Sequence, residues 1–327
     1  PEPDRLDDFP HPRETARLFG HEDAEQSFID AFNSGRLHHA WLLTGPKGIG
    51  KATLAWKIAR FLISQPLEDD GGLFGETAPV PTTLDIEEDH PVARRMLALS
   101  EPRLFLLRRP LDARTGNLKQ DITVDAARAL KGFFAMSAAD GGRRVVIIDA
   151  ADEMNASAAN AVLKVLEEPP RNTYLLLVCH QPARLLPTIR SRCRVLRLSE
   201  LSVTNLESAM SAASGEPSQR ESEPSTAALS GGSVGRALQM RAAGGIETYR
   251  HILEVFASLP NFDRSLAIRL ANSVSGRDSA QRLDLIVSLT ELLLFRLARA
   301  GATGMPPIES FPGEAETLNR LCPDPIT

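Results

Sequence analysis

Residues 160–193 read NAVLKVLEEPPRNTYLLLVCHQPARLLPTIRSRC, and this stretch decides the fold. It begins in a helical pattern, because apolar residues between 159 and 166 recur at the spacing of one helix face. Pro169 and Pro170 end that helix, since proline cannot continue the hydrogen-bond ladder. The apolar run 175–178 that follows is typical of a buried parallel strand. The stretch therefore predicts one helix–strand unit of a covered parallel sheet.

Outward from this stretch, short apolar runs alternate with helical patterns along the first part of the chain. The runs are 40–43, 104–107, 145–148 and 175–178. Such an alternation indicates a parallel sheet with helices on both faces. Another helix is expected to begin at Asp125 as its N-cap, because aspartate accepts hydrogen bonds from the free N–H groups of a first turn.

A glycine-rich loop follows the first apolar run. Residues 45–51 read GPKGIGK and precede a helical pattern. Glycines let backbone N–H groups turn toward a phosphate, while the helix N-terminus and the lysine add positive charge. The pattern calls next for Ser or Thr as a magnesium ligand, but Ala52 stands there, and the following threonine lies about 100° further round the helix. The residues expected to form this degenerate nucleotide site are Gly45, Gly48, Gly50, Lys51, Thr53 and Asp149.

Residues 160–193 resemble the matching segment of bacterial clamp-loader subunits, which belong to the AAA+ class. Residues 11–22, 36–40 and 122–128 resemble the same family, so that the likeness covers nearly all of 11–200. The resemblance implies an α/β fold, with an AAA+ P-loop domain built on a parallel sheet. It also implies a small helical lid domain and a C-terminal all-helical collar domain.

Several positions depart from the family's motor subunits. Asp149 matches the strand-end aspartate that supports magnesium, but Ala150 replaces the glutamate that activates water. Cys179-His180 replaces the polar first sensor, and Arg236 lies one position from the place of the second-sensor arginine. Residues 63–144 contain no cysteine, which excludes the four-cysteine zinc site of many relatives. ATP or ADP with magnesium is therefore at most a weak ligand, and no other cofactor is expected.

The tripeptide Ser191-Arg192-Cys193 is intact beside this damaged site. The resemblance implies that Arg192 acts in trans, on the ATP of a neighbouring subunit. It implies a non-motor, stator-like clamp-loader subunit that does not hydrolyse ATP by itself. The implied partners are the motor subunits, called gamma or tau, and the delta subunit, and through them the sliding clamp and primed DNA.

Three domains are expected from these patterns. They are an AAA+ RecA-like domain over 1–199, a small lid domain over 200–242 and a helical collar for oligomerisation over 243–327. Apolar residues along 283–297 exceed what one helix surface needs, so this helix should pack in a bundle or against another subunit. Glycines, prolines and an acidic run between 65 and 100 indicate a surface insertion.

Composition limits the class of protein. With 327 residues, 43% of them hydrophobic, the chain can bury a sizeable core and carry smaller helical domains. It holds no run of about 18 apolar residues, so we expect no membrane segment. Three scattered cysteines predict a reducing cytoplasm. The formal net charge of -5 argues against a protein that wraps nucleic acid by itself.

Two enzymatic alternatives stay open. An autonomous AAA+ ATPase motor would need compensation for Ala52 and Ala150. A P-loop phosphotransferase acting on a small molecule would need an acceptor-binding motif, and the sequence shows none. A DNA-binding module would need a basic stripe, whereas the arginine pairs at 94–95, 108–109 and 143–144 are isolated.

Overall fold

The computed structural model describes residues 2–3, 5–6, 9–15, 17–67, 80–135, 142–215, 224–274 and 279–322. The chain forms two compact units, one of residues 1–200 with 212–214 and the other of residues 201–211 with 215–327. No helix in the described ranges is both long enough and apolar enough to cross a membrane.

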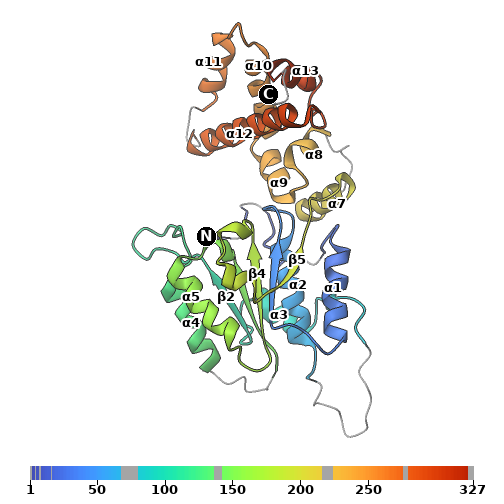
Figure 1. The fold of residues 1–327 in the computed structure, drawn as a ribbon, viewed down its shortest axis with the longest axis vertical. Coiled ribbons are helices and arrows are strands. Elements are labelled where there is room, and N and C mark those ends of the chain that lie inside the picture. The colour runs from blue at the N-terminus through green and yellow to red at the C-terminus, as the bar shows by residue number, and fades with distance from the viewer. Residues whose placement is uncertain are drawn as a thin grey trace. The chain divides into compact units, whose positions relative to one another are not determined.

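The first unit is built on a five-stranded parallel sheet in the order β2-β3-β4-β1-β5 (Figure 1). Its strands are β1 Ala40–Thr44, β2 Leu104–Arg108, β3 Arg144–Asp149, β4 Thr173–Cys179 and β5 Arg194–Arg197. The four predicted apolar runs all form strands, which confirms the expected parallel α/β domain. The sequence did not reveal β5, because arginines at both of its ends leave only a two-residue apolar core.

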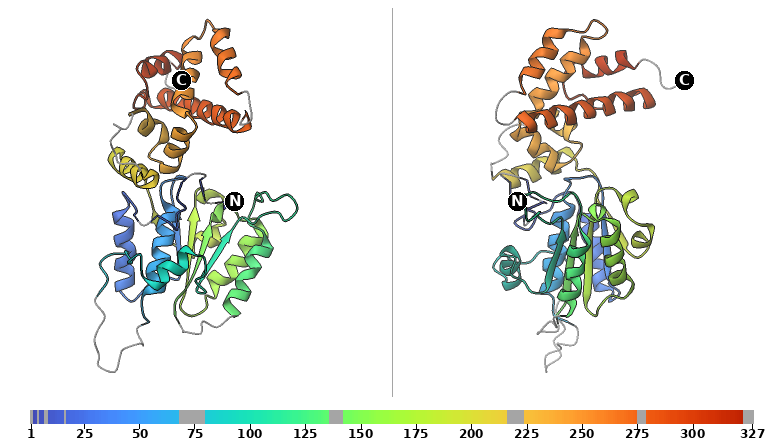
Figure 2. Two further views of the ribbon diagram at one scale, coloured as in Figure 1. Left: turned by 180° about the vertical axis from the view of Figure 1, so that it is seen from behind. Right: turned by 90° about the vertical axis from the view of Figure 1, so that its left-hand side faces the viewer.

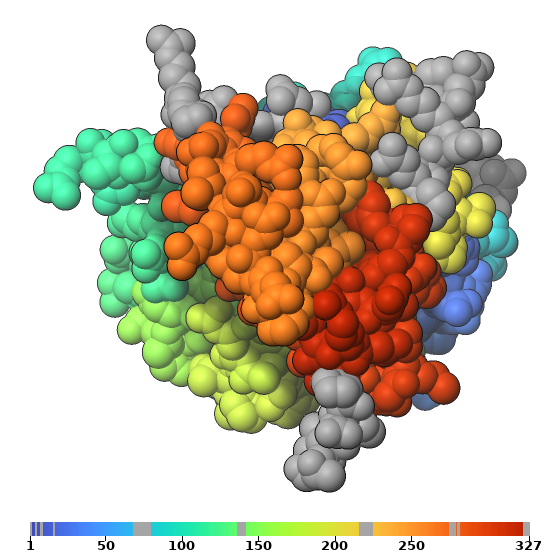
Figure 3. Space-filling view, turned by 90° about the horizontal axis from the view of Figure 1, so that it is seen from above, coloured from blue at the N-terminus to red at the C-terminus, as the bar shows by residue number. Residues whose placement is uncertain are grey.

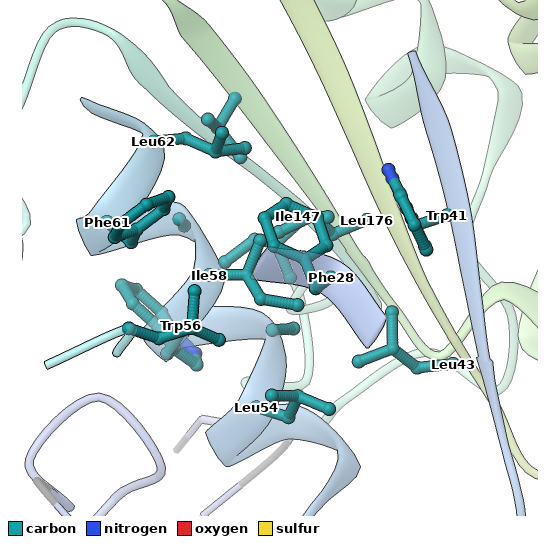
Figure 4. Packing of buried hydrophobic residues seen from close by; sticks show 14 of the residues in the cluster. Phe28, Trp41, Leu43, Leu54, Trp56, Ile58, Phe61, Leu62, Ile147 and Leu176 are labelled. Atoms are coloured by element: carbon teal, nitrogen blue, oxygen red, sulfur yellow. The ribbon is translucent and has the colours of Figure 1, made fainter. Parts of the chain in front are cut away.

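Helices cover both faces of the sheet (Figure 2). One face carries α1 Glu22–Asn33, α2 Lys51–Ser64 and α3 Pro91–Leu97, and the other carries α4 Val124–Ala135, α5 Ala156–Glu167 and the short α6 Pro187–Arg190. Strand side chains alternate between these layers, so Trp41 and Leu43 join the first core while Leu42 joins the second. Figure 4 shows Ile58 of α2 in the first core, near Ile147 of β3.

Side-chain hydrogen bonds to the first turn set where α5 and α4 start. The Asn155 side chain accepts a hydrogen bond from the N–H of Ala158 at 2.9 Å, and α5 ends just before the two prolines, as predicted. Helix α4 begins at Val124, so the expected N-cap at Asp125 is wrong. The Thr123 hydroxyl instead accepts the N–H of Ala126 at 3.5 Å, and Asp125 lies in the first turn.

The segment expected as a surface insertion contributes to the core. Leu84 is fully buried, and Val92 and Met96 of α3 are nearly so. His90 caps α3 by accepting the N–H of Val92 at 3.2 Å. The composition of 65–100 hid these apolar anchors among glycines, prolines and acids, so the expectation was wrong for Leu84 and for α3, whereas most of 80–91 lies at the surface. Residues 68–79 lie outside the described ranges.

Every regular element in the described residues of the second unit is a helix. Its helices are α7 Val203–Ser214, whose last three residues belong to the first unit, α8 Pro224–Ser230, α9 Val234–Ala242, α10 Gly245–Ala257, α11 Arg264–Asn272, α12 Ser279–Thr303 and α13 Glu314–Leu321. Leu229 and Met240 share one core with Tyr249, Leu289 and Leu293. Residues from both sides of the expected lid–collar boundary thus meet in that core, and the three-domain division stays a prediction.

Candidate functional site

The predicted phosphate loop lies at the carboxyl edge of the sheet. It follows β1, whose Thr44 pairs in register with Cys179 at the end of β4. Asp149, at the end of β3, pairs with Val178 one residue earlier on β4. From β1 the chain passes to the far strand β2 and then returns through β3 and β4, so that the order of strands in the sheet switches between β4 and β1. Open α/β sheets bind ligands in the crevices at such switch points.

Glycines are required in the loop for steric reasons. Gly45, Gly48 and Gly50 have φ values of 145°, 80° and 105°, in the region that disfavours L side chains. A Cβ at Gly45 would lie 2.3 Å from the carbonyl oxygen of Leu198, and one at Gly50 would lie 2.8 Å from Leu18 Cδ1. The loop is therefore wedged between the chain leaving β5 and the N-terminal segment.

Lys51 is turned inward, toward its own loop. This first residue of α2 is 2% exposed, and its ammonium group donates to the carbonyl oxygen of Gly45 at 2.7 Å and to that of Pro46. Burial lowers the pKa of Lys51 to about 8, although Asp149 and Asp152 favour its charged form. A phosphate at this loop would compete with those two carbonyl oxygens for the lysine.

The residues present fit a nucleotide's phosphates better than its magnesium ion. Positive-φ glycines, a helix N-terminus and Lys51 are the parts of an anion cradle. Ala52 offers a methyl group where a hydroxyl ligand is needed, and Thr53 is the next residue of the same helix. No group of three or more His, Cys, Asp or Glu side chains suited to a metal occurs within the described residues. Asp149 would thus be the carboxylate left to support magnesium.

Asp152 organises the site from beside Asp149, and sequence reasoning missed it. Its carboxylate accepts the N–H groups of His180 at 2.9 Å and Gln181 at 3.0 Å. Burial raises its pKa, but these hydrogen bonds outweigh burial and hold the pKa below its usual value. Burial and then the charge of Lys51 lower the pKa of His180 to about 4, so this imidazole is neutral at pH 7. An acid three residues past a strand end was the only available signal.

The N-terminal segment packs against the end of the loop. His21 is buried, and its Nε2 donates to the carbonyl oxygen of Ile49 at 2.7 Å. Burial lowers the pKa of His21, so the neutral ring is favoured. This contact brings residues 18–21 beside Gly50, next to the predicted phosphate loop. A cleft of about 600 Å³ on the other side of the loop is lined by Thr44 and His180, among others.

Arg192 lies at the other end of the strands, where the amino ends of β1 and β5 meet. It precedes β5, whose first residue pairs with Trp41 near the start of β1, whereas the phosphate loop follows the end of β1. The length of β5, four residues at about 3.3 Å each, separates those edges by roughly 13 Å. Arg192 donates to the carbonyl oxygen of Thr188 at 3.1 Å and to the carboxylate of Glu167 at 3.0 Å. The structure thus places the loop residues and Asp149 together and Arg192 apart from them.

Arg236 lies one position from the place where motor subunits carry the second-sensor arginine. It is an exposed residue of α9. The Ser233 hydroxyl caps that helix by accepting the N–H of Arg236 at 3.2 Å. Cys179 is fully buried, and burial raises its pKa and that of Cys193 to about 12. Neither thiol is therefore suited to nucleophilic chemistry.

Comparison with known proteins adds an independent finding. A family model described as "DNA polymerase III, delta subunit" matches residues 20–202. DNA polymerase III subunit delta' of Pseudomonas aeruginosa is 39% identical over 220 residues, which are 66% of this chain and 60% of that protein. DNA polymerase III subunit gamma/tau of Mycobacterium bovis is 28% identical over 187 residues, 55% of this chain and 28% of that protein. The chain thus covers less than two thirds of either relative.

A solved structure is also similar. A DNA polymerase III gamma subunit-related protein of Thermotoga maritima aligns with a TM-score of 0.40 and 15% identity, over 90% of this chain and 92% of that one. At this level the likeness carries no argument about function.

Proposed function

Because this chain belongs to the DNA polymerase III delta-subunit family, whose curated relatives include proteins named subunit delta', we propose that it is a non-motor subunit of a clamp loader. In this role it helps to load a sliding clamp onto primed DNA, in the cytoplasm, together with motor subunits of the gamma/tau type and a delta subunit. It holds the geometry of the assembly and presents Arg192 to the ATP of an adjacent motor subunit.

One observation carries the proposal: the arginine and the phosphate loop lie at opposite edges of one sheet. Arg192 precedes β5, while the loop follows β1, whose end pairs with the end of β5. A separation of roughly 13 Å is too long for this arginine to serve its own loop's nucleotide by contact. This separation supports a role of Arg192 toward a phosphoryl group on another subunit rather than on its own chain.

Arg192 can leave its present ion pair with Glu167 with little loss of stability. Its side chain is 39% exposed and that of its partner Glu167 is 44% exposed. Ion pairs this exposed contribute about 0–1 kcal/mol, because water and salt screen them. A negatively charged phosphate on a neighbouring subunit can therefore replace Glu167 as the partner of the guanidinium group.

The chain's own nucleotide site supports the non-motor role. Ala52 and Ala150 supply neither a metal ligand nor a general base. Glu153, the nearest acid beyond Asp152, lies 2.9 Å from Arg109 and is engaged there. Lys51 is bound by carbonyl groups of its own loop. Hydrolysis at this site would thus lack two of the groups that position and activate the attacking water.

The helical unit supplies a surface for assembly. Leu283, Val287 and Leu294 of α12 are each about half exposed, although they are large and apolar. Their spacing of four and seven residues puts them on one side of the helix. Figure 3 shows the outer surface of this unit, with α12 and α13 in red and α10 and α11 in orange. Exposed apolar stripes of this kind are typical of subunit contacts.

The test is to purify the full chain alone and to measure ATP binding and ATP turnover separately. We expect ATP turnover far below the rate of about 1–100 per second that is typical of phosphoryl-transfer enzymes, whether or not ATP binds. The matched preparation is the complex with gamma/tau-type and delta subunits, in which turnover should appear. A lone chain that turns over ATP in the enzymatic range would instead support the autonomous ATPase, and failure to assemble would refute the subunit role.

A further inference from the structure

Glu167 and Arg192 form an ion pair near the amino ends of the strands. Glu167 is the last residue of α5, and Arg192 comes two residues after the end of α6. Arg192 Nη2 lies 3.0 Å from Glu167 Oε1, and Arg192 Nη1 donates to the carbonyl oxygen of Thr188 at 3.1 Å. The guanidinium group that the proposed function directs to a neighbouring ATP is thus bound to an acid of its own chain.

The backbone on both sides of this ion pair is held in place. The N–H of Arg192 donates to the carbonyl oxygen of Ile189 at 3.1 Å, in the turn that follows α6. On the other side, His39 Nε2 donates to the carbonyl oxygen of Leu166 at 3.0 Å, which ties the end of α5 to the residue before β1. The two charged groups can therefore separate by side-chain rotation, without a movement of a helix or a strand.

The place of Glu167 at a helix end is electrostatically unfavourable unless cations lie near it. The last carbonyl groups of a helix carry partial negative charge, so cations are favoured there and acids are not. Glu167 and Glu168 nevertheless occupy the end and the C-cap of α5, where they outnumber Lys164, the basic residue of the last turn. Residues that break such a local rule are expected at functional sites. The guanidinium group of Arg192 compensates the excess negative charge at this helix end.

We propose that Glu167 is a latch, which holds Arg192 on its own chain and so slows hydrolysis until the phosphates of the neighbouring subunit's ATP compete for the guanidinium group. This inference rests on the proposed function of Arg192. The latch is weak, because both side chains are more than one third exposed and solvent screens the pair.

The size of the effect follows from the time that Arg192 spends on Glu167. An arginine that is bound to Glu167 can engage a phosphoryl group only in the remaining fraction of the molecules, and the rate falls in proportion to that fraction. An exposed ion pair of this kind corresponds to a factor of about two to five. Removal of the latch should therefore raise the rate of hydrolysis by that factor.

The test measures ATP hydrolysis at the adjacent site in the reconstituted clamp loader, after size-exclusion chromatography has shown equal stoichiometry. Glu167→Gln removes the charge of the side chain and keeps its shape. The matched control is Glu168→Gln, which makes the same change at the next exposed acid. Arg192→Ala is measured alone and combined with Glu167→Gln. Each complex is measured at about 50 mM and at about 500 mM salt, because salt screens exposed charges.

We expect Glu167→Gln to raise the hydrolysis rate at saturating ATP about two- to fivefold at the lower salt concentration. The dependence of the rate on ATP concentration should stay the same, because the latch acts after ATP has bound to the motor subunit. The gain should shrink at the higher salt concentration, and Glu168→Gln should not produce it. It should also vanish when Arg192 is replaced by alanine, since the latch acts only through that residue.

The outcomes separate this inference from the function on which it rests. A lower rate with Glu167→Gln would overturn the latch and make Glu167 a positioning residue for Arg192. An unchanged rate, or an equal gain with Glu168→Gln, would also overturn the latch, while a loss of hydrolysis with Arg192→Ala would keep the proposed function standing. Wild-type hydrolysis with Arg192→Ala alone would refute the proposed function and the latch together.

Discussion

Glu314→Ala should unfold the helical unit far more readily than any exposed change on the same helix. Glu314 is fully buried, and its carboxylate accepts the hydroxyl of Tyr249 at 2.6 Å and the N–H of Ser310 at 2.6 Å. It also pairs with Arg296, from Nε at 2.8 Å and from Nη2 at 3.1 Å. These bonds join α10, α12 and α13 through one side chain.

The magnitude follows from what the substitution leaves behind. Arg296 is 6% exposed and would keep its charge in the core without a counter-ion. Removal of one partner of a buried ion pair costs about 3–5 kcal/mol, because the other charge stays desolvated. Burial and then the hydrogen bond to Glu314 raise the pKa of Tyr249, so the hydroxyl stays a neutral donor.

The assay can separate the two units. Both tryptophans, Trp41 and Trp56, lie in the first unit, so their fluorescence reports its unfolding alone. Circular dichroism reports the helices of both units. With a urea dependence of about 2 kcal/mol/M, we expect Glu314→Ala to lower the midpoint of the helical unit by about 2 M. The tryptophan transition should stay in place.

The matched control is Glu316→Ala, an exposed acid on the same helix, which should change stability by less than about 0.5 kcal/mol. The reasoning would be refuted by a loss below about 1 kcal/mol for Glu314→Ala, or by an equal shift of the tryptophan transition.

Further outcomes follow from other positions. Because the pKa of Lys51 falls to about 8, the unfolded chain binds more protons there between pH 8 and about 10.5, so this lysine should make stability rise with pH across that window. Urea titrations of Lys51→Met should show a flatter rise, and an unchanged slope would count against the buried lysine. Gly45→Ala should cost the first unit about 2–4 kcal/mol by tryptophan fluorescence, since its Cβ meets a backbone oxygen at 2.3 Å, whereas Gly132→Ala in α4 should be neutral or stabilising. Leu283→Glu with Val287→Glu should leave the monomer folded but reduce its incorporation into the clamp loader at least about tenfold, measured by size-exclusion chromatography; normal incorporation would move the contact elsewhere.

Periodicity and motifs carried the prediction of the first unit. Apolar runs predicted β1 to β4 because both faces of a parallel sheet are covered, as the cores around Trp41 and Leu42 show. The same signal failed at β5, an edge strand whose Arg194 guanidinium lies over the Trp41 ring, 4.9 Å from its centroid. The other edge strand, β2, keeps a four-residue apolar run, whereas β5 has only two apolar residues between arginines, which is too short a run for periodicity to reveal.

The candidate site was predictable in residue types but not in geometry. The loop glycines and Asp149 follow from motif and strand order. The inward turn of Lys51 depends on carbonyl groups whose direction only the folded loop sets. Asp152 and Glu314 escaped notice because a buried carboxylate and a solvated one look alike in a sequence; their partners lie 28 and 65 residues away.

The central claim is that Arg192 acts on a neighbouring subunit's ATP, and its most direct test is single-site hydrolysis in the reconstituted clamp loader. Arg192→Ala is compared with Arg171→Ala, an exposed arginine just before β4 that does not line the cleft beside the phosphate loop, after equal stoichiometry has been checked. Fingers of this kind contribute about 10³–10⁵ in rate, so we expect hydrolysis at the adjacent site to fall by at least about 10³ and clamp loading to fall with it. Arg192→Lys should rescue little, because lysine lacks the planar fork. Wild-type hydrolysis and loading with Arg192→Ala, or an equal loss with Arg171→Ala, would contradict the claim.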